Sequence, residues 1–294
     1  MDFLYQAIKR AAGAVEEKPL AEAAVEVDSD TKALLSELKM AQPLSPPPSV
    51  RPKKTGPIRK SFEVKHPLDY LVAFLSHPVL TPNVAAMEQC RVLRARLREI
   101  VNTKKLKTLL LTSAMQGEGK TLLSVNLAYA LSQIEGMKVL LVDVDLRRPG
   151  VAKFLKMGRP EGLDKYLMGH AQFDEICWKL TPNLDVVPTR ELRDESTELL
   201  HGNRMREFLA ETSSAYDVVL LDGPPMFPIV DAQVLAQLAD GVLLVIRAHK
   251  TQFQSARLAA DLLKTRLIAT ILNGVERLPD NQYYAGQLGR LKKS

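Results

Sequence analysis

The chain has 294 residues, of which 46% are apolar, 25% are charged and only 5% are aromatic. These values are typical of a globular protein with one large or two small domains, and the few aromatic side chains argue against an all-β sandwich and against a base-stacking surface for nucleic acid. The net charge of +6 would suit phosphate, an acidic partner or an anionic membrane face.

The two cysteines, Cys90 and Cys177, form no Cys-x-x-Cys motif, so we expect neither a disulfide scaffold nor a cysteine metal site. The first ten residues lack the basic and apolar regions of a secretory signal. No apolar run approaches the roughly 18 residues that span a bilayer. We therefore expect a cytoplasmic protein that reaches the inner face of a membrane through a partner.

Composition divides the chain into four predicted parts. Residues 1–42 carry apolar residues at helical spacing and are predicted to be a helical N-terminal interaction segment. Residues 43–83 are predicted to be a Pro-rich basic linker, whose cations at 51–65 would suit a peripheral contact with an anionic leaflet. Residues 84–280 are expected to form the catalytic domain, and residues 281–294 a flexible tail with tyrosines.

Within the catalytic domain, predicted helices alternate with short apolar runs that show no polar alternation, which is typical of strands buried on both faces of a parallel sheet. The predicted fold class is therefore α/β, with a mostly parallel sheet and helices on both faces. The expected strands are 107–112, 138–144, 184–187, 217–222, 241–247 and 268–273, and the expected helices are 84–102, 119–134, 195–211, 229–239 and 252–266.

A glycine-rich turn between a predicted strand and helix, Ala114 to Thr121, indicates a P-loop NTPase. Its glycines allow backbone N–H groups to converge on phosphate oxygens, Lys120 would reach the β and γ phosphates, and the Thr121 hydroxyl would bind Mg²⁺. The alternative is a chance Gly-Lys-Thr at a helix start. The predicted nucleotide-binding residues of this segment are Gly117, Glu118, Gly119, Lys120, Thr121 and Leu122.

Two further predicted strands end in carboxylates, where ligands bind in open α/β sheets. Asp143 and Asp145, spaced i and i+2, should share one face, and such a pair makes sense beside a cation such as Mg²⁺, Lys120 or Arg147. Asp222 occupies the position of a Walker B carboxylate, which binds Mg²⁺ directly or through water. For the paired aspartates, the alternative is a solvated turn after a strand.

With these three motifs in order, the sequence resembles the bacterial tyrosine kinases of capsule and exopolysaccharide systems, a P-loop family. The likeness covers roughly residues 84–290, and it implies an ATP- and Mg²⁺-dependent protein-tyrosine autokinase that regulates polysaccharide polymerisation and export. By this likeness Lys120 and Thr121 would bind phosphates and Mg²⁺, and Asp222 would hold the metal. Asp143 and Asp145, in an Asp-x-Asp-x-Arg motif that ends at Arg147, would assist the metal and deprotonate the tyrosine hydroxyl.

The same resemblance implies contacts between subunits. The family's Glu-x-x-Arg-x-x-Arg motif stands here as Glu88, Arg91 and Arg94, which implies a homo-oligomeric ring, although the pattern also fits a solvated helix face. Tyr283 and Tyr284 would be phosphorylated in trans by a neighbouring subunit, or they are plain tail tyrosines. The family also implies a separate transmembrane activator.

Asn273, at the end of the last predicted strand, matches the position that contacts adenine in related ATPases, or it is simply a polar strand end. Two other functions remain open: a partitioning or positioning P-loop ATPase, and a nucleotide-binding scaffold with little phosphotransfer. The first carries a signature lysine five residues before the P-loop lysine, where this chain has Met115. That difference favours the kinase, and nucleic acid is not an expected partner.

Overall fold

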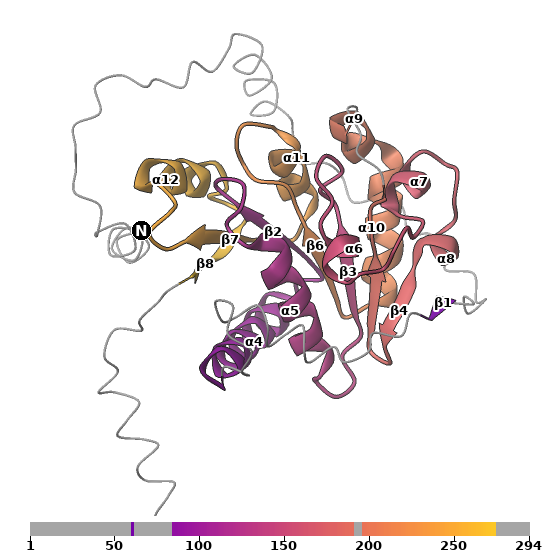
Figure 1. Ribbon diagram of the computed structural model, residues 1–294, viewed down its shortest axis with the longest axis horizontal. Helices are drawn as coiled ribbons and strands as arrows, with labels where there is room; N and C mark the ends of the chain where they lie inside the picture. The colour runs from indigo at the N-terminus through magenta and orange to yellow at the C-terminus, as the bar shows by residue number, and fades with distance from the viewer. Residues whose placement is uncertain (1–59, 62–83, 191–195, 275–294) are drawn as a thin grey trace, which may run out of the picture.

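The structure, a computed structural model, describes residues 60–61, 84–190 and 196–274, which are organised around one eight-stranded sheet (Figure 1). The order across the sheet is β1-β4-β5-β3-β6-β2-β7-β8. Its strands are β1 (Lys60–Ser61), β2 (Thr108–Ser113), β3 (Val139–Asp143), β4 (Trp178–Thr181), β5 (Leu184–Val187), β6 (Val218–Asp222), β7 (Gly241–Arg247) and β8 (Leu267–Asn273).

Helices connect the strands and cover the two faces of the sheet (Figure 1). They are α4 (Val84–Lys104), α5 (Lys120–Ser132), α6 (Val151–Phe154), α7 (Leu163–Leu167), α8 (Phe173–Ile176), α9 (Ser196–His201), α10 (Asn203–Ala215), α11 (Asp231–Leu238) and α12 (Phe253–Leu262). The predicted class of a mostly parallel α/β sheet is confirmed. The predicted segments 1–42 and 281–294, and the linker apart from β1, lie outside the described residues.

Neighbouring residues of the central strands bury their side chains on opposite faces. Leu109 and Leu111 of β2 belong to the core beneath α4, α5 and α6, while Leu110 belongs to the core beneath α7, α10, α11 and α12. Strands between two helical layers are therefore mainly apolar, and β2 adds the buried polar side chains of Thr108, Thr112 and Ser113 to its three leucines. This double burial explains why the sequence shows no polar alternation in these strands.

The edge of the sheet differs from the prediction. β4 runs antiparallel to β5, because only Pro182 and Asn183 separate the two strands and so short a connection can only form a hairpin. β4 has no clear signal in the residue pattern, since three of its four residues are only partly buried and Lys179 is exposed. β1, within the predicted linker, adds a parallel pairing to β4.

The predicted helix 195–211 is also corrected. Over residues 196–215 the structure has two helices, α9 and α10, separated by Gly202, whose backbone is extended at φ −65° and ψ 162°. Glycine is a poor helix former, and an Arg206 guanidinium nitrogen donates to the His201 carbonyl, 2.9 Å away, at the end of α9. The region 151–176 holds three short helices that were not predicted.

The topology brings three carboxyl strand ends together, because β6 lies between β3 and β2. Asp143 of β3 pairs in register with Asp222 of β6, and Leu111 of β2 pairs with the same Asp222. The P-loop leaves β2 directly beside these residues. Three motifs that are far apart in the chain therefore meet at one edge of the sheet.

Candidate active site

The P-loop joins β2 to α5 through two glycines with left-handed backbones. Gly117 has φ +79° and Gly119 has φ +92°, and a Cβ on Gly119 would lie 2.2 Å from the Asn273 amide nitrogen. Both positions therefore need glycine. Gly119 is the N-cap of the 13-residue helix α5, which begins at Lys120. The N–H groups of the first turn of this helix have no partner within the helix, so they are available to bind phosphate.

The back of the P-loop is braced by buried polar contacts. The Glu118 side chain is only 1% exposed; it accepts hydrogen bonds from the Met115 amide, at 3.2 Å, and from the Thr251 hydroxyl. The Glu118 carbonyl accepts the Asn273 side-chain amide at 2.9 Å. Glu118 and Asn273 thus shape the loop from behind, and their predicted contacts with nucleotide and adenine stay predictions.

A cavity of about 450 Å³ opens in front of the loop. Its size suits a small-molecule ligand. Asp145 is the one carboxylate among its lining residues, and it shares the cavity with Lys120 and Arg147. The cavity is lined by Gln116, Gly117, Gly119, Lys120, Thr121, Leu122, Asp145, Arg147, Arg148, Pro225, Phe227, Pro228 and Ile229.

Asp143 and Asp222 are buried at the ends of their strands, at 0% and 1% exposure. Asp222 accepts the Ser124 hydroxyl at 2.8 Å and is also hydrogen-bonded by Thr121. One oxygen of Asp143 accepts two backbone N–H groups at the start of α6, each at 2.9 Å, and the other accepts the Asp145 amide at 3.2 Å. Asp143 and Asp145 therefore do not share one environment as the i, i+2 spacing predicted, because β3 ends at Asp143.

Burial raises the pKa of all three carboxyl groups. Desolvation lifts the pKa of Asp222 from 3.8 to about 6, against the lowering effect of its hydroxyl donors and of Lys120. Desolvation, and then the charge of Asp222, hold the pKa of Asp143 well above its usual range. Desolvation also raises the pKa of Asp145, while the Arg148 amide and the Lys120 charge lower it. The three carboxyl groups can therefore all ionise more easily when a cation is bound beside them.

The donors at this edge are compatible with Mg²⁺ bound together with a phosphate ligand. Thr121, Asp143 and Asp222 offer hydroxyl and carboxylate oxygens, the ligands that a hard cation prefers. In the described part of the chain, no group of three or more His, Cys, Asp or Glu residues has the geometry of a metal site. Because Mg²⁺ usually takes one or two carboxylates plus phosphate and water, these residues fit a Mg²⁺–nucleotide complex.

The raised pKa of Asp222 predicts a pH-dependent effect of Asp222→Asn in the nucleotide-free protein. Between about pH 4 and pH 6 the folded wild type binds more protons than the unfolded chain, so its free energy of unfolding should fall as the pH rises through the pKa of about 6. Asparagine has no such ionisation. The stability of the variant relative to wild type should therefore increase by up to about 3 kcal/mol between pH 4 and pH 7.

Urea unfolding of both proteins at several pH values measures this difference. Asparagine can cost stability through an imperfect hydrogen bond to Ser124, so the pH trend is the predicted quantity. A difference that stays constant from pH 4 to pH 7 would contradict the assignment of Asp222 as a carboxyl group forced to ionise in a buried site.

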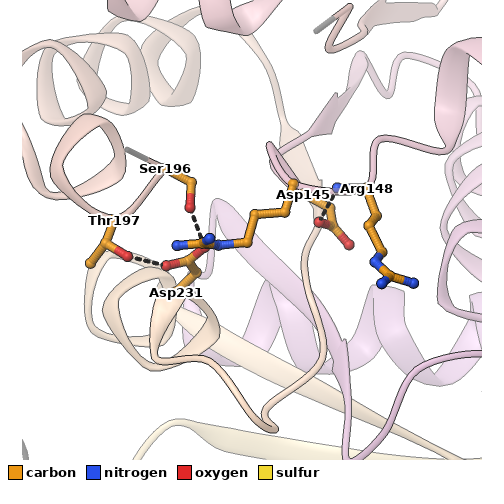
Figure 2. A network of polar contacts seen from close by, with 6 residues as sticks. Asp145, Arg148, Ser196, Thr197 and Asp231 are labelled. Carbon is orange, nitrogen blue, oxygen red and sulfur yellow. Dashed lines mark hydrogen bonds and ion pairs between the residues drawn. The ribbon is translucent and has the colours of Figure 1, made fainter. Parts of the chain in front are cut away.

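Two polar groups of the site were missed at the sequence level. Ser124 lies three residues after Thr121, on the same face of α5, and this spacing is the signal that could have identified it as a second donor to Asp222. Asp231, at the start of α11, pairs with Arg147 at 2.9 Å. It also accepts the hydroxyls of Ser196 and Thr197 (Figure 2). No local motif marks Asp231 as part of the site.

Other predicted residues lie away from the cavity or outside the described residues. Glu88, Arg91 and Arg94 are all in α4; the Arg91 side chain is exposed and that of Arg94 is half-buried. The subunit contacts expected of this helix stay a prediction. Tyr283 and Tyr284 lie outside the described residues. Across the described residues, no helix combines the length and apolar character needed to cross a membrane.

A mostly parallel sheet, a glycine turn that leads into α5 and acidic ends on two neighbouring strands together define a P-loop nucleotide-binding domain. Residues 107–269 accordingly match the AAA domain family.

Comparison with known proteins narrows the class. The chain is 33% identical to the tyrosine-protein kinase YwqD of Bacillus subtilis over 206 residues, which are 69% of this chain and 86% of the relative. It is 30% identical to a putative tyrosine-protein kinase in the cps region of Klebsiella pneumoniae, covering 69% of this chain and 28% of that protein. The chain belongs to the family of bacterial tyrosine-protein kinases.

Solved structures agree with this placement. The kinase domain of the Escherichia coli tyrosine kinase ETK superposes with a TM-score of 0.63 at 30% identity, covering 67% of this chain and 79% of that one. The cell division ATPase MinD of Pyrococcus furiosus superposes with a TM-score of 0.50 at 22% identity, covering 62% and 79%, and shares the fold alone. The family predicted from the three motifs is confirmed.

Proposed function

We propose that this chain is an ATP-dependent protein-tyrosine autokinase that regulates the polymerisation and export of an exopolysaccharide or capsule. The observation that carries the proposal is the placement of Asp145, which lines the cavity together with Lys120, while Asp143 and Asp222 are buried at two neighbouring strand ends. A kinase needs one carboxylate that faces the acceptor hydroxyl and others that serve the metal. Membership of the tyrosine-kinase family indicates that the phosphate acceptor is a tyrosine side chain of a protein.

In this proposal, Lys120 and the N–H groups of the first turn of α5 bind the phosphates of ATP. Gly117 and Leu122, which also line the cavity, would contact the nucleotide. Thr121, Asp143 and Asp222 would hold Mg²⁺, which neutralises charge on the β and γ phosphates when it is bound. Asn273 would lie beside the adenine. Phosphoryl transfer needs little covalent chemistry from the protein, so catalysis would come from positioning the reacting groups and balancing their charges.

Asp145 accepts the proton of the incoming tyrosine hydroxyl in this scheme. Its Oδ1 accepts the Arg148 amide at 3.0 Å (Figure 2), which fixes the carboxylate at the cavity wall. The raised pKa of this carboxyl group, caused by burial, makes it a better proton acceptor than an exposed aspartate. Arg147, also in the cavity wall, balances the charge of the transferring phosphoryl group.

The proposal extends to partners and location. The arginines of α4, with Glu88, would form the contacts of a homo-oligomeric ring in which Tyr283 and Tyr284 are phosphorylated in trans. A transmembrane polysaccharide co-polymerase would act as activator and hold this cytoplasmic chain near the inner face of the membrane. The basic linker would add a peripheral membrane contact. The exposed Arg91 on α4 supports the first of these contacts.

A nucleotide switch of the partitioning-ATPase type is less well supported. Met115, 43% exposed, stands at the position where that class has its signature lysine. The likeness to MinD is limited to the fold, whereas the tyrosine kinases match at 30% identity or more.

The proposal is tested by incubating the purified 294-residue chain with Mg·ATP and reading phosphotyrosine by mass spectrometry. We expect phosphate on Tyr283 and Tyr284 of the wild type. A Tyr283→Phe/Tyr284→Phe variant should lose most autophosphorylation and still phosphorylate an added tyrosine peptide, because its catalytic cavity is unchanged. Phosphate that is found mainly on other tyrosines would contradict the tail assignment. ATP turnover without any phosphotyrosine would contradict the kinase.

A further inference from the structure

The carboxylate of Asp231 is a buried anion that joins three separate segments. It stands at the first residue of α11, is 1% exposed, and is not part of the P-loop or of the two acidic strand ends. The Arg147 Nε donates to Asp231 Oδ2 at 2.9 Å, and the Ser196 hydroxyl donates to the same oxygen at 2.6 Å. The Thr197 hydroxyl donates to Oδ1, as Figure 2 shows.

The Arg147 side chain has a different exposure from its partner. It is 32% exposed, against 1% for Asp231, and it lines the cavity together with Lys120. Among the described residues Asp231 is the hydrogen-bond partner of the Arg147 side chain, and it takes only Nε. Within residues 84–190 and 196–274 the two terminal guanidinium nitrogens have no hydrogen-bond partner, and they form the end of arginine that binds phosphate oxygens in a fork.

The hydroxyls of Ser196 and Thr197 indicate which partner of the Asp231–Arg147 pair is held in place by the other. A buried carboxylate without partners would cost a large desolvation energy, but these two donors, from the start of α9, satisfy Asp231 even without the arginine. The carboxylate is therefore held by α9 and α11, which are packed elements, while Arg147 sits on a loop after β3. We infer that Asp231 stays in place and that its carboxylate holds the Arg147 side chain in position.

We propose that Asp231 is a positioning residue for the phosphotransfer reaction: it fixes the Arg147 guanidinium at the phosphate end of the cavity, and Ser196 and Thr197 fix Asp231. This inference rests on the proposed function, because it assigns the free end of Arg147 to the γ-phosphate. A long arginine side chain that is held at Nε loses little further conformational freedom when it binds phosphate. Asp231 touches no reacting atom and acts only through Arg147.

A double-mutant cycle with Asp231→Asn and Arg147→Ala tests the inference. The readout is the dissociation constant of a non-hydrolysable ATP analogue divided by that of ADP, each with Mg²⁺. Asp231→Asn should raise this ratio by about tenfold in the wild-type background and by less than about twofold when residue 147 is already alanine, because the two changes remove one interaction. The variant should lower kcat for an added tyrosine peptide with little change in the KM for that peptide.

Two further variants separate positioning from a structural role. Asp185→Asn alters another buried carboxylate, which accepts the Tyr216 hydroxyl at 2.7 Å and does not line the cavity; it should lower the melting temperature without changing the ratio. If Asp231→Asn does not fold, the Ser196→Ala/Thr197→Ala variant keeps the Asp231 charge and should raise the ratio by about two- to fivefold in the same direction.

The inference is overturned if Asp231→Asn, or the double alanine variant in its place, leaves the ratio unchanged, or if the effect persists in full in the Arg147→Ala background. These outcomes are distinct from a failure of the proposed function. The ratio is a binding measurement, so it decides the role of Asp231 even if no phosphotyrosine is formed. A wild type that phosphorylates tyrosine but shows no coupling would refute only the positioning role.

Discussion

Lys120→Met is expected to lower the rate of tyrosine phosphorylation by at least about a thousandfold while the domain stays folded, because it removes a preorganised cation from the phosphate site. Lys120 is the first residue of α5, is 8% exposed and lines the cavity. Its charge lowers the pKa of both Asp145 and Asp222, which places the ammonium group near the two acidic strand ends. Methionine keeps the length of the side chain without its charge.

Phosphotyrosine formed per minute at saturating ATP measures the loss, and urea unfolding checks the fold. Lys250→Met is the matched control, since Lys250 is exposed and approaches the same loop, with Nζ 3.5 Å from where a Cβ on Gly117 would lie, but does not line the cavity. It should change the rate by less than about threefold, as a surface substitution. A Lys120→Met protein that keeps a tenth or more of the activity would contradict the phosphate role of this lysine.

Asp145→Asn is expected to lower the phosphorylation rate by about 10² to 10⁴, the usual contribution of a positioned general base. Binding of ATP should be unchanged or tighter, because the substitution removes a negative charge from the wall of the cavity. The wild-type rate should rise with pH through the raised pKa of Asp145, since only the ionised carboxylate accepts a proton. That acid limb should vanish in the asparagine variant.

Rates measured from pH 5 to pH 8 with a tyrosine peptide, together with nucleotide affinities, test this assignment. Asp240→Asn serves as the control, because Asp240 also accepts backbone amides, those of Lys107 and Thr108 at 2.8 Å, but lies outside the cavity. If Asp145→Asn retains both its rate and the acid limb of the profile, the general base is another group.

The P-loop and the two acidic strand ends were predictable because each is encoded locally. Glycines at 117 and 119 are required by left-handed backbones, and the strands that precede the motifs carry runs of consecutive apolar residues because helices cover both faces. The β4–β5 hairpin was not predictable in the same way, because β4 is short and partly exposed. Gly202 marks the break between α9 and α10, and the single predicted helix 195–211 ran through this glycine.

The different environments of the site carboxylates could not be predicted from the sequence. Asp143 and Asp145 look equivalent at i and i+2, but β3 ends between them, so that backbone N–H groups enclose Asp143 while Asp145 faces the cavity. Asp231 lies 84 residues from its partner Arg147. A contact at that separation depends on how the helices pack on the sheet, and no local residue spacing predicts it.

The cavity is expected to transfer phosphate to tyrosine instead of to water. The most direct test is the ratio of phosphotyrosine formed to ADP released, measured in one reaction with Mg·ATP and an excess of tyrosine peptide. A kinase of the kind proposed gives a ratio close to one. Sustained ADP release with a ratio near zero would contradict the account and would indicate a nucleotide switch.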